Sequence, residues 1–348
     1  MKTQKHPFYS FSKLDSFNAI YNFALGGRGI GKTHGRKVKA VTAALDKGHE
    51  FIFMRRYQEE VKSAQRTFMD DMQARGLFDE YDFRMQGYML QASGIEFRDD
   101  KKREWRTLGY FIALSTAQRY KGTSFPKVRT IIFDEFIIEK GNMHYLPDEA
   151  TVFANFYSTV DRWRTEDELK AYFLANTVSI MNPYFMKYEI TPNDGEFVRK
   201  FKLDDGSYFL AVHFIHSDEF AASVKNTKFG QFIAGTEYEQ YAVGAVFHDN
   251  NDHLLEYKGA KARYRYTLET RKGAFSVWHD GVEGRYYMQA KRPKDEKIFV
   301  LEAEMMRDDT VFVSRSNKLM QYLRAAFSNG GMMFDNATTR NAMSEVFK

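Results

Sequence analysis

Short apolar runs separated by longer helical segments occupy residues 1–190. The apolar runs are of strand length and cover residues 19–25, 51–54, 130–136 and 171–176. Helices are expected over residues 33–45, 58–74 and 148–163, and a hairpin insertion over 81–114. Apolar runs of this length are typical of strands buried on both faces of a parallel sheet. Their alternation with helices predicts an α/β domain over residues 1–190.

The pattern changes after residue 190. Turn residues at 191–195 and 204–206 flank a single strand over 208–215, and residues 220–232 could form a helix. We interpret residues 191–227 as a linker or lid. From residue 228 onward the chain is rich in strands, expected at 262–268, 274–279, 285–288 and 298–301, followed by helices at 316–328 and 337–347. Residues 228–348 are therefore expected to form a small α+β domain.

Residues 26–33 have the pattern G-x-x-x-x-G-K-T of a phosphate-binding loop. The loop follows an apolar strand and opens a helix, which is the context that the motif requires. Its glycines let backbone N–H groups turn toward phosphate oxygens, Lys32 is expected to reach the β- and γ-phosphates, and Thr33 is expected to ligate Mg²⁺. The sequence thus predicts ATP and Mg²⁺ as cofactors. The predicted ATP-binding residues are Gly26, Gly27, Arg28, Gly29, Ile30, Gly31, Lys32 and Thr33.

The apolar run 130–136 contains two adjacent carboxylates, Asp134 and Glu135, which is the Walker B pattern. Asp134 would hold the Mg²⁺ shell opposite Thr33. Glu135 would polarise the attacking water as a general base. A strand that ends in two solvated acids would also fit this pattern taken alone. Its place downstream of a phosphate-binding loop favours the catalytic interpretation.

The run 171–176 closes on a polar residue, Asn176. In additional-strand (ASCE, RecA-like) P-loop ATPases, such a strand lies between the P-loop strand and the Walker B strand. Its terminal polar residue senses the γ-phosphate, so Asn176 is a sensor candidate. An asparagine that merely ends a strand in a turn fits this sequence almost as well.

Composition excludes several classes of protein. The chain has no cysteine, so it can form neither disulfides nor a thiolate metal site. No apolar stretch approaches the ~20 residues of a membrane span, and the first residues lack the apolar core of a signal peptide. The net charge of +5 is spread over both halves and mildly favours a nucleic-acid partner. A location in the cytoplasm is expected.

Several blocks longer than the Walker motifs indicate a family. They cover residues 21–33, 51–57, 130–140, 182–185, 229–238 and 334–336. These blocks resemble the DNA-packaging ATPases of small phi-29-like tailed phages, and the likeness covers nearly the whole chain. The resemblance implies a homomeric ring, pentameric in the family, docked on the portal (connector) of an empty procapsid. Such a ring translocates double-stranded DNA inward with ATP hydrolysis, sits transiently on the procapsid in the host cytoplasm, and is not expected in the mature virion.

The resemblance also implies roles for individual residues. Arg162 sits where the family has an arginine finger that acts on the neighbouring subunit, and Arg164 is a near neighbour that could substitute. Lys121 aligns with a second basic residue thought to act across the interface. Arg55 and Arg56 follow the second strand, at the edge where ring translocases carry DNA-gripping loops. Without the resemblance, a solvated helix end is the better interpretation of the arginines at 162 and 164, and structural salt bridging explains the pair at 55 and 56 equally well.

The C-terminal domain looks like the ribonuclease-H-like domain that larger terminases use as a nuclease. That chemistry needs several carboxylates around two metal ions. The available acids, Asp249, Asp252, Asp280 and Glu283, do not stand at the spacing of a triad. In phi-29-like members this domain has lost cleavage and serves as a docking module for the portal or a structural packaging RNA, and we expect the same here.

Two other functions remain compatible with the motifs. One is a different ASCE nucleic-acid ATPase, such as a helicase or DNA-transfer ATPase, which should unwind strands or stack single-stranded bases on aromatic side chains. The other is an assembly protein that uses nucleotide as a switch. Glu135 argues against a pure switch, because a switch has little need of a positioned base.

Overall fold

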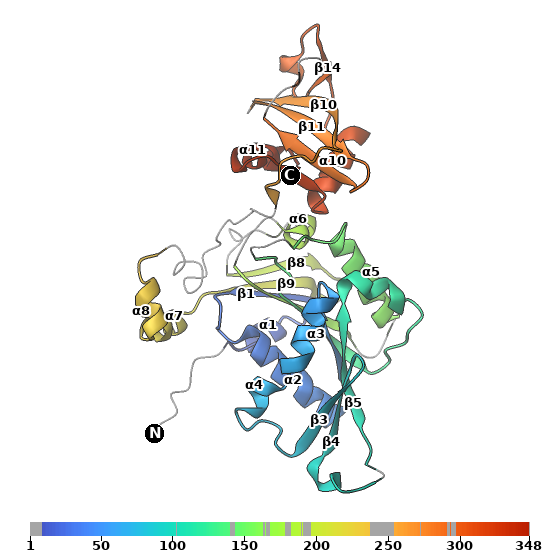
Figure 1. The fold of residues 1–348 in the computed structure, drawn as a ribbon, viewed down its shortest axis with the longest axis vertical. Coiled ribbons are helices and arrows are strands. Elements are labelled where there is room, and N and C mark those ends of the chain that lie inside the picture. Colours follow the sequence, from blue (N-terminus) through green and yellow to red (C-terminus); the bar gives the residue numbers. More distant parts are fainter. Residues whose placement is uncertain are drawn as a thin grey trace. The chain divides into compact units, whose positions relative to one another are not determined.

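The computed structural model describes residues 9–101, 103–139, 143–162, 164, 168–177, 182–188, 190, 196–236, 254–271, 273–290, 293 and 297–347. The chain divides into two compact units (Figure 1). The first comprises residues 1–137, 152–178 and 191–248, and the second comprises residues 138–151, 179–190 and 249–348. Among the described residues, no helix is both long enough and apolar enough to cross a membrane.

A nine-stranded sheet forms the centre of the first unit, in the order β3-β4-β5-β2-β6-β7-β1-β9-β8. Neighbouring strands from β5 to β9 in this order are parallel, and β3, β4 and β8 add antiparallel edges. The strand bounds are β1 Tyr21–Gly26, β2 Glu50–Arg55, β3 Tyr81–Gln86, β4 Met89–Gly94, β5 Arg106–Ala113, β6 Val128–Asp134, β7 Lys170–Asn176, β8 Phe197–Lys202 and β9 Tyr208–Ile215. The predicted parallel-sheet α/β domain is confirmed.

The P-loop strand β1 and the Walker B strand β6 are not neighbours, because β7 lies between them. Tyr21 pairs with Ala171, and Ala171 pairs in turn with Ile131. The sequence-based expectation of an inserted strand ending in Asn176 is therefore confirmed. Because the three strands are parallel, their carboxyl ends meet at one edge of the sheet, which is where ligands bind in open α/β sheets.

Helices cover both faces of this sheet. On one face, apolar side chains of α2 (Lys32–Lys47), α3 (Gln58–Thr67) and α4 (Asp70–Gln73) pack on alternate strand residues in one core. On the other face, Phe153 of α5 (Glu149–Asp161) stacks on Phe133 with ring centroids 5.8 Å apart and lies 4.6 Å from Phe173. Burial on both faces explains why the inner positions of these strands are nearly all apolar.

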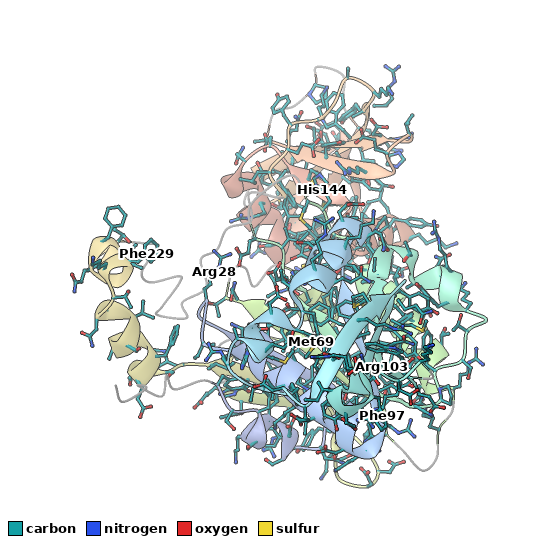
Figure 2. The ribbon with its side chains drawn as sticks, turned by 60° about the horizontal axis from the view of Figure 1, so that its bottom comes forward. Arg28, Met69, Phe97, Arg103, His144 and Phe229 are labelled. Atoms are coloured by element: carbon teal, nitrogen blue, oxygen red, sulfur yellow. The ribbon has the colours of Figure 1, made fainter. Side chains whose placement is uncertain are left out.

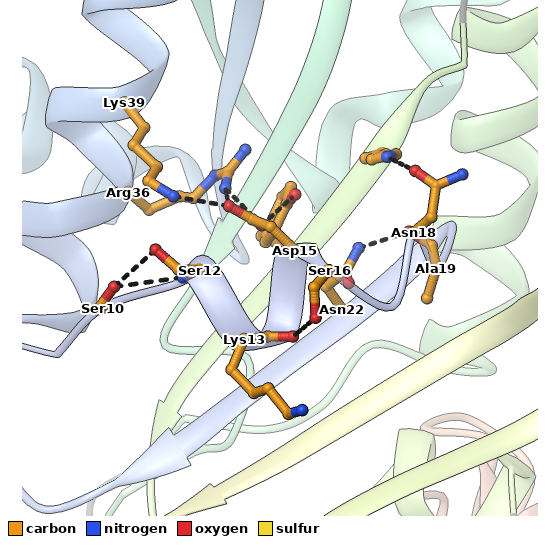
Figure 3. A network of polar contacts seen from close by, with 12 residues as sticks. Ser10, Ser12, Lys13, Asp15, Ser16, Asn18, Ala19, Asn22, Arg36 and Lys39 are labelled. Carbon is orange, nitrogen blue, oxygen red and sulfur yellow. Dashed lines mark hydrogen bonds and ion pairs between the residues drawn. The ribbon is translucent and has the colours of Figure 1, made fainter.

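The short helix α1 (Ser12–Asp15) is tied to α2 through a polar network around Asp15 (Figure 3). The Asp15 carboxylate accepts hydrogen bonds from Arg36 Nη1 at 3.1 Å, Lys39 Nζ at 2.7 Å and the Tyr172 hydroxyl at 2.8 Å. The Arg36 guanidinium also lies 3.3 Å from the centroid of the Tyr172 ring. These contacts fix the P-loop helix against β7.

The interpretation of residues 191–227 as a linker or lid is wrong for its strands. β8 and β9 form a hairpin that extends the main sheet, and β9 pairs in parallel with β1 from Tyr21 to Gly26. Gly26 is required at this contact, because a Cβ there would lie 2.8 Å from the Ile215 Cβ. Turn residues around 204–206 suggested a linker, but they connect two strands of one sheet.

The helix expected over 220–232 is two helices, α7 (Asp218–Lys225) and α8 (Lys228–Ile233). The break is set by Thr227, whose hydroxyl accepts a hydrogen bond from the Gly230 N–H at 2.9 Å and starts a new helix. Phe229 projects from α8 and is 57% exposed (Figure 2). Residues 228–236 belong to the first unit, so the predicted domain boundary at 228 is wrong.

A six-stranded sheet forms the second unit, in the order β14-β13-β10-β11-β12-β15. Its strands are β10 Arg263–Thr270, β11 Gly273–Asp280, β12 Arg285–Gln289, β13 Ile298–Val300, β14 Thr310–Phe312 and β15 Met332–Phe334. β10, β11 and β12 are antiparallel neighbours. On the other side of β10, β13 pairs with it in parallel, and β14 pairs in parallel with β13. If β10 to β14 are numbered 1 to 5, they lie in the order 3-2-1-4-5 of a ribonuclease-H-like sheet.

Helices α10 (Lys318–Ser328) and α11 (Ala337–Phe347) pack on this sheet. The bounds of α11 match the sequence-based prediction, and those of β10 to β13 differ from it by one or two residues. The second unit also includes residues 138–151 and 179–190, among them α6 (Pro183–Tyr188). Assigning all of residues 1–190 to the first domain was therefore wrong. Local pattern could not show that these two segments leave it.

Candidate nucleotide site

The P-loop joins β1 to α2 and has the backbone that its glycines permit. Gly29 and Gly31 have φ angles of 85° and 91°, a left-handed region that other residues rarely adopt. Gly31 is the N-cap of α2, so the N–H groups of the first helical turn face the loop. Ile30 is 3% exposed, and its carbonyl accepts a hydrogen bond from Tyr9 N at 2.9 Å. The loop is thus anchored to the core.

Lys32 and Asn176 meet at the carboxyl edge of the sheet. The Lys32 Nζ donates to the carbonyl oxygens of Gly26 and Gly27, each at 2.9 Å, and to Asn176 Oδ1 at 3.2 Å. The ammonium group is therefore placed between the P-loop and the end of β7. In this position Asn176 lies beside the group that binds the terminal phosphates in P-loop proteins.

Thr33 and Asp134 present oxygen atoms to one another across the site. The Thr33 hydroxyl donates to Asp134 Oδ1 at 2.8 Å. A hydroxyl and a carboxylate are hard oxygen ligands of the kind that Mg²⁺ prefers, and these two are close enough to share one ion. The residues therefore fit the predicted Mg²⁺ site.

These side chains line a single cavity of about 380 Å³, a size suited to a nucleotide. The cavity thus brings together most of the predicted ATP-binding loop, the predicted Mg²⁺ ligands, the base and the sensor, which come from the ends of β1, β6 and β7; Gly26, Gly27 and Ile30 of the loop do not line it. Its lining residues are Arg28, Gly29, Gly31, Lys32, Thr33, His34, Asp71, Arg75, Asp134, Glu135, Ala175 and Asn176.

Glu135 has an unusual backbone for a residue with a side chain, with φ at 56°. Such conformations persist where the surroundings enforce them, and they concentrate at functional sites. The backbone of the next residue is held by two hydrogen bonds. Phe136 N donates to Leu174 O at 3.3 Å, and Phe136 O accepts from Arg56 Nη2 at 2.6 Å. The Glu135 side chain remains 54% exposed.

Arg55 binds both Walker B carboxylates. Its guanidinium donates to Asp134 Oδ2 at 2.8 Å and forms an ion pair with Glu135 Oε2. Burial opposes the positive charge, but the neighbouring carboxylates of Asp134 and Glu135 outweigh it and raise the pKa of Arg55. Arg55 thus agrees with the salt-bridging alternative of the sequence analysis, which did not identify the two carboxylates as its partners. Adjacent residues at a strand end point to opposite sides, so Arg55 and Arg56 should have been treated separately.

The structure contradicts the predicted DNA contacts of this arginine pair. Arg56 is 1% exposed, and its guanidinium lies 5.7 Å from the centroid of the Phe133 ring in addition to binding Phe136 O. Arg55 is 16% exposed and committed to two carboxylates. A phosphate of DNA could reach neither guanidinium without displacing these partners.

We expect Arg56→Met to lower the stability of the protein by roughly 1.5–3 kcal/mol, because it leaves the buried Phe136 carbonyl without its charged donor. The change should appear as a lower midpoint of thermal unfolding, whereas Arg66→Met on the exposed surface of α3 should leave the midpoint unchanged. If Arg56 contacts DNA instead, the variant would keep its stability and lose salt-sensitive DNA binding.

The two residues expected to act on a neighbouring subunit lie together. Arg162 is exposed just after α5 and donates to Thr123 O at 2.8 Å and to Thr159 O at 3.2 Å. Lys121 and Thr159 line the same small cavity of about 40 Å³. Neither Arg162 nor Lys121 lines the nucleotide cavity of its own chain.

Arg164, the alternative finger, is engaged with backbone. It donates to the carbonyls of Phe125 and Val128, and to Val160 O at 3.0 Å. Val128 begins β6 and Asp134 ends it, so this cluster lies about 20 Å from the cavity along the strand. These bonds favour a structural role for Arg164 and leave Arg162 as the better finger candidate.

Four cavity residues were absent from the sequence-based prediction, namely His34, Asp71, Arg75 and Ala175. His34 follows the P-loop directly, and the motif itself could have suggested it. Asp71 and Arg75 come from the α4 region, and nothing in the local sequence marks them as cavity residues. Only the packing of α4 beside α2 brings them to the site.

The candidate nuclease acids of the second unit do not converge where they are described. Asp280 ends β11, and its Oδ1 accepts hydrogen bonds from the N–H groups of Val282 at 2.8 Å and Glu283 at 3.1 Å. It therefore shapes the turn to β12. Glu283 Oε2 accepts from the Tyr287 hydroxyl at 3.2 Å. Asp249 and Asp252 lie outside the described residues. Within the described part of the chain, no three His, Asp or Glu side chains form a metal-binding group.

Sequence comparison finds relatives over the full length of the chain. The profile of a family described as podovirus DNA encapsidation protein (Gp16) matches residues 3–348. The DNA packaging protein of Bacillus phage phi29 is 28% identical over 347 residues, which cover 99% of this chain and 98% of that protein. The DNA packaging protein of Bacillus phage B103 is 30% identical over 336 residues, with coverage of 96% and 98%.

Solved structures agree with these relatives. A chain of the bacteriophage phi-29 viral genome packaging motor assembly is similar to this one with a TM-score of 0.55 and 27% identity, covering 98% of both chains. A chain of the Phi-28 gp11 DNA packaging motor has a TM-score of 0.55 at 20% identity, which shows the fold alone, and covers 98% of this chain and 97% of that chain. Both alignments extend over both compact units.

Proposed function

This chain belongs to the podovirus DNA encapsidation (Gp16) family of viral DNA packaging proteins, and we propose that it is an ATP-hydrolysing motor that moves double-stranded DNA into a preformed procapsid. One observation carries the ATPase assignment. Most of the P-loop lines one cavity at the carboxyl edge of a parallel sheet, together with Asp134, Glu135 and Asn176. Family membership favours packaging over the helicase and switch alternatives.

Each cavity residue has a chemical task in this proposal. Lys32 and the N–H groups that precede α2 bind the phosphates. Thr33 and Asp134 would hold Mg²⁺, which neutralises charge on the phosphoryl group in transfer. Glu135 accepts a proton from the attacking water, and Asn176 contacts the γ-phosphate. The Glu135 side chain is 54% exposed but paired with the Arg55 guanidinium, so this ion pair must loosen before the carboxylate can accept a proton.

The motor is proposed to work as a homomeric ring, in which Arg162 and Lys121 complete the site of the adjacent subunit. The support is geometric: both residues lie on one surface near the end of α5, and neither lines the cavity of its own chain. An arginine from a neighbour makes hydrolysis depend on that neighbour's position, which suits ordered firing around a ring. Five subunits are proposed from the resemblance to phi-29-like motors.

The experiment that tests the function measures ATP hydrolysis and DNA uptake together. Purified protein, procapsids with portals, Mg–ATP and long linear duplex DNA should give DNA that is protected from added nuclease. Lys32→Ala should abolish both hydrolysis and protection, because it removes the cation that binds the phosphates. ATP hydrolysis without DNA protection would contradict translocation, and an active Lys32→Ala variant would contradict the assigned site.

The second unit is proposed to be a docking module without nuclease activity. The turn-forming bonds of Asp280 support this, since its Oδ1 is committed to backbone N–H groups. The proposed docking partners are the portal and a structural packaging RNA, with the protein acting in the host cytoplasm while attached to the procapsid and absent from the mature virion. If the purified protein cuts DNA in a metal-dependent way and Asp280→Asn abolishes the cutting, the second unit is an active nuclease and this proposal is contradicted.

A further inference from the structure

Part of the nucleotide cavity has no role in the chemistry at the phosphates. His34 and Asp71 line it together with Arg75, apart from the carboxyl ends of β6 and β7. Asp71 belongs to α4, and its carboxylate is bound to α2 by His34 Nδ1 at 2.7 Å and by Lys37 Nζ at 3.0 Å. Lys37 lies one helical turn beyond Thr33, so Asp71 sits further along α2 than the Mg²⁺ ligands.

The position of the phosphates decides what this region can bind. Lys32 would bind the β- and γ-phosphates, and Thr33 and Asp134 would hold Mg²⁺, where these side chains line the cavity. The nucleoside must then occupy the remaining lining. His34 follows Thr33 directly, so the region around His34 and Asp71 is the next part of the cavity that a nucleotide extending from the P-loop would meet.

The Asp71 carboxylate has capacity for further donors. One oxygen accepts from His34 and the other from Lys37, whereas a carboxylate offers about four lone-pair sites in all. Its side chain is 44% exposed. Burial opposes its charge, but the hydrogen bonds from His34 and Lys37 outweigh burial and lower the pKa of Asp71. Asp71 therefore stays ionised near neutral pH and can only accept hydrogen bonds.

We propose that Asp71 accepts a hydrogen bond from the ribose 2′-hydroxyl of the bound nucleotide, so that the site prefers ribonucleotides over 2′-deoxyribonucleotides. Carboxylates take this role toward the ribose in other nucleotide-binding folds. The P-loop leads into α2, and α2 also carries the two donors that hold Asp71. The position of the Asp71 carboxylate is therefore fixed relative to the phosphate site. This inference rests on the proposed nucleotide-binding function and adds a specificity to it.

Equilibrium binding of Mg–ADP and Mg–2′-deoxy-ADP to the full-length protein tests the proposal without the complication of hydrolysis. Wild type should bind ADP about tenfold tighter, as expected when a hydrogen bond to a charged acceptor is lost. Asp71→Ala should bind both nucleotides with the weaker affinity. Asp70→Ala is the matched control, because Asp70 is the exposed neighbour outside the cavity, and it should keep the wild-type ratio.

Four outcomes separate the possibilities when inosine diphosphate is added to the comparison. Equal binding of ADP and 2′-deoxy-ADP by wild type overturns the ribose contact and leaves the nucleotide site intact. A preference that survives Asp71→Ala overturns the assignment to Asp71. Discrimination against inosine diphosphate instead of the deoxynucleotide would assign Asp71 to the base amino group. Failure of wild type to bind ADP at all would contradict the proposed function itself. If Asp71→Ala does not fold, the comparison of nucleotides on wild type still decides the ribose contact.

Discussion

Glu135→Gln is expected to bind Mg–ATP and to hydrolyse it about 10²–10⁴ times more slowly than wild type, the range for loss of a positioned general base. The substitution keeps the shape of the side chain and removes the proton acceptor. Glu135 is 54% exposed in a cavity that also holds Lys32, Thr33 and Asp134, so the amide should fit without disturbing the phosphate site. Single-turnover hydrolysis, with nucleotide affinity measured separately, gives the comparison.

A control variant and the separate measurement of nucleotide affinity make this test specific. Glu59→Gln on α3 changes an acid that is 83% exposed and is not part of the cavity lining, and it should leave turnover unchanged. A Glu135→Gln variant that loses affinity as well as rate would point to a role in binding. Unchanged turnover would remove Glu135 from its assigned role, and the water would then need another base.

Mixing Arg162→Ala subunits into wild type is expected to reduce DNA-stimulated ATP hydrolysis by more than the fraction of variant added. An arginine finger supplied by a neighbour is worth about 10³–10⁵ in rate, so each variant subunit should silence an adjacent wild-type site. The guanidinium of Arg162 is exposed and bound to two backbone carbonyls, which it can exchange for a phosphate at modest cost. The full Arg162→Ala ring should be nearly inactive.

The matched control for this experiment is Arg119→Ala. Arg119 is exposed and lies two residues before Lys121, on the same stretch of chain, and its loss should reduce activity in neither pure nor mixed rings. A rate that falls only in proportion to the Arg162→Ala fraction would mean self-contained sites. The ring proposal would then have to be abandoned, or the finger assigned to another residue.

Local sequence was sufficient for much of the site. The P-loop requires glycine at left-handed positions, a lysine and a hydroxyl at fixed offsets, and the Walker B strand requires an apolar run before its acids. These requirements are met by contiguous residues, so they are readable without a structure. The structure places Thr33 beside Asp134 and Lys32 beside Asn176, four residues that the sequence analysis had already selected as site candidates.

The different roles of Arg55 and Arg56 could not be predicted from the local sequence. Arg55 and Arg56 are adjacent and chemically identical, but one binds the Walker B carboxylates and the other the carbonyl of Phe136. Which side of the sheet each residue faces depends on the register of β2 against β6. Sequence pattern gave both residues the same role, and the structure assigns neither of them to DNA.

By itself, the sequence determined the class of the protein: a P-loop strand, a Walker B strand, an inserted strand between them, and a C-terminal domain of strands closed by two helices. Those features depend on spacing and on apolar runs that neighbouring residues encode. Tertiary structure alone decided that β8 and β9 extend the main sheet, that residues 138–151 and 179–190 join the second unit, and that Asp71 reaches the nucleotide cavity. The physical reason is that strand pairing and helix packing join residues far apart in the chain, and no local pattern specifies the partner.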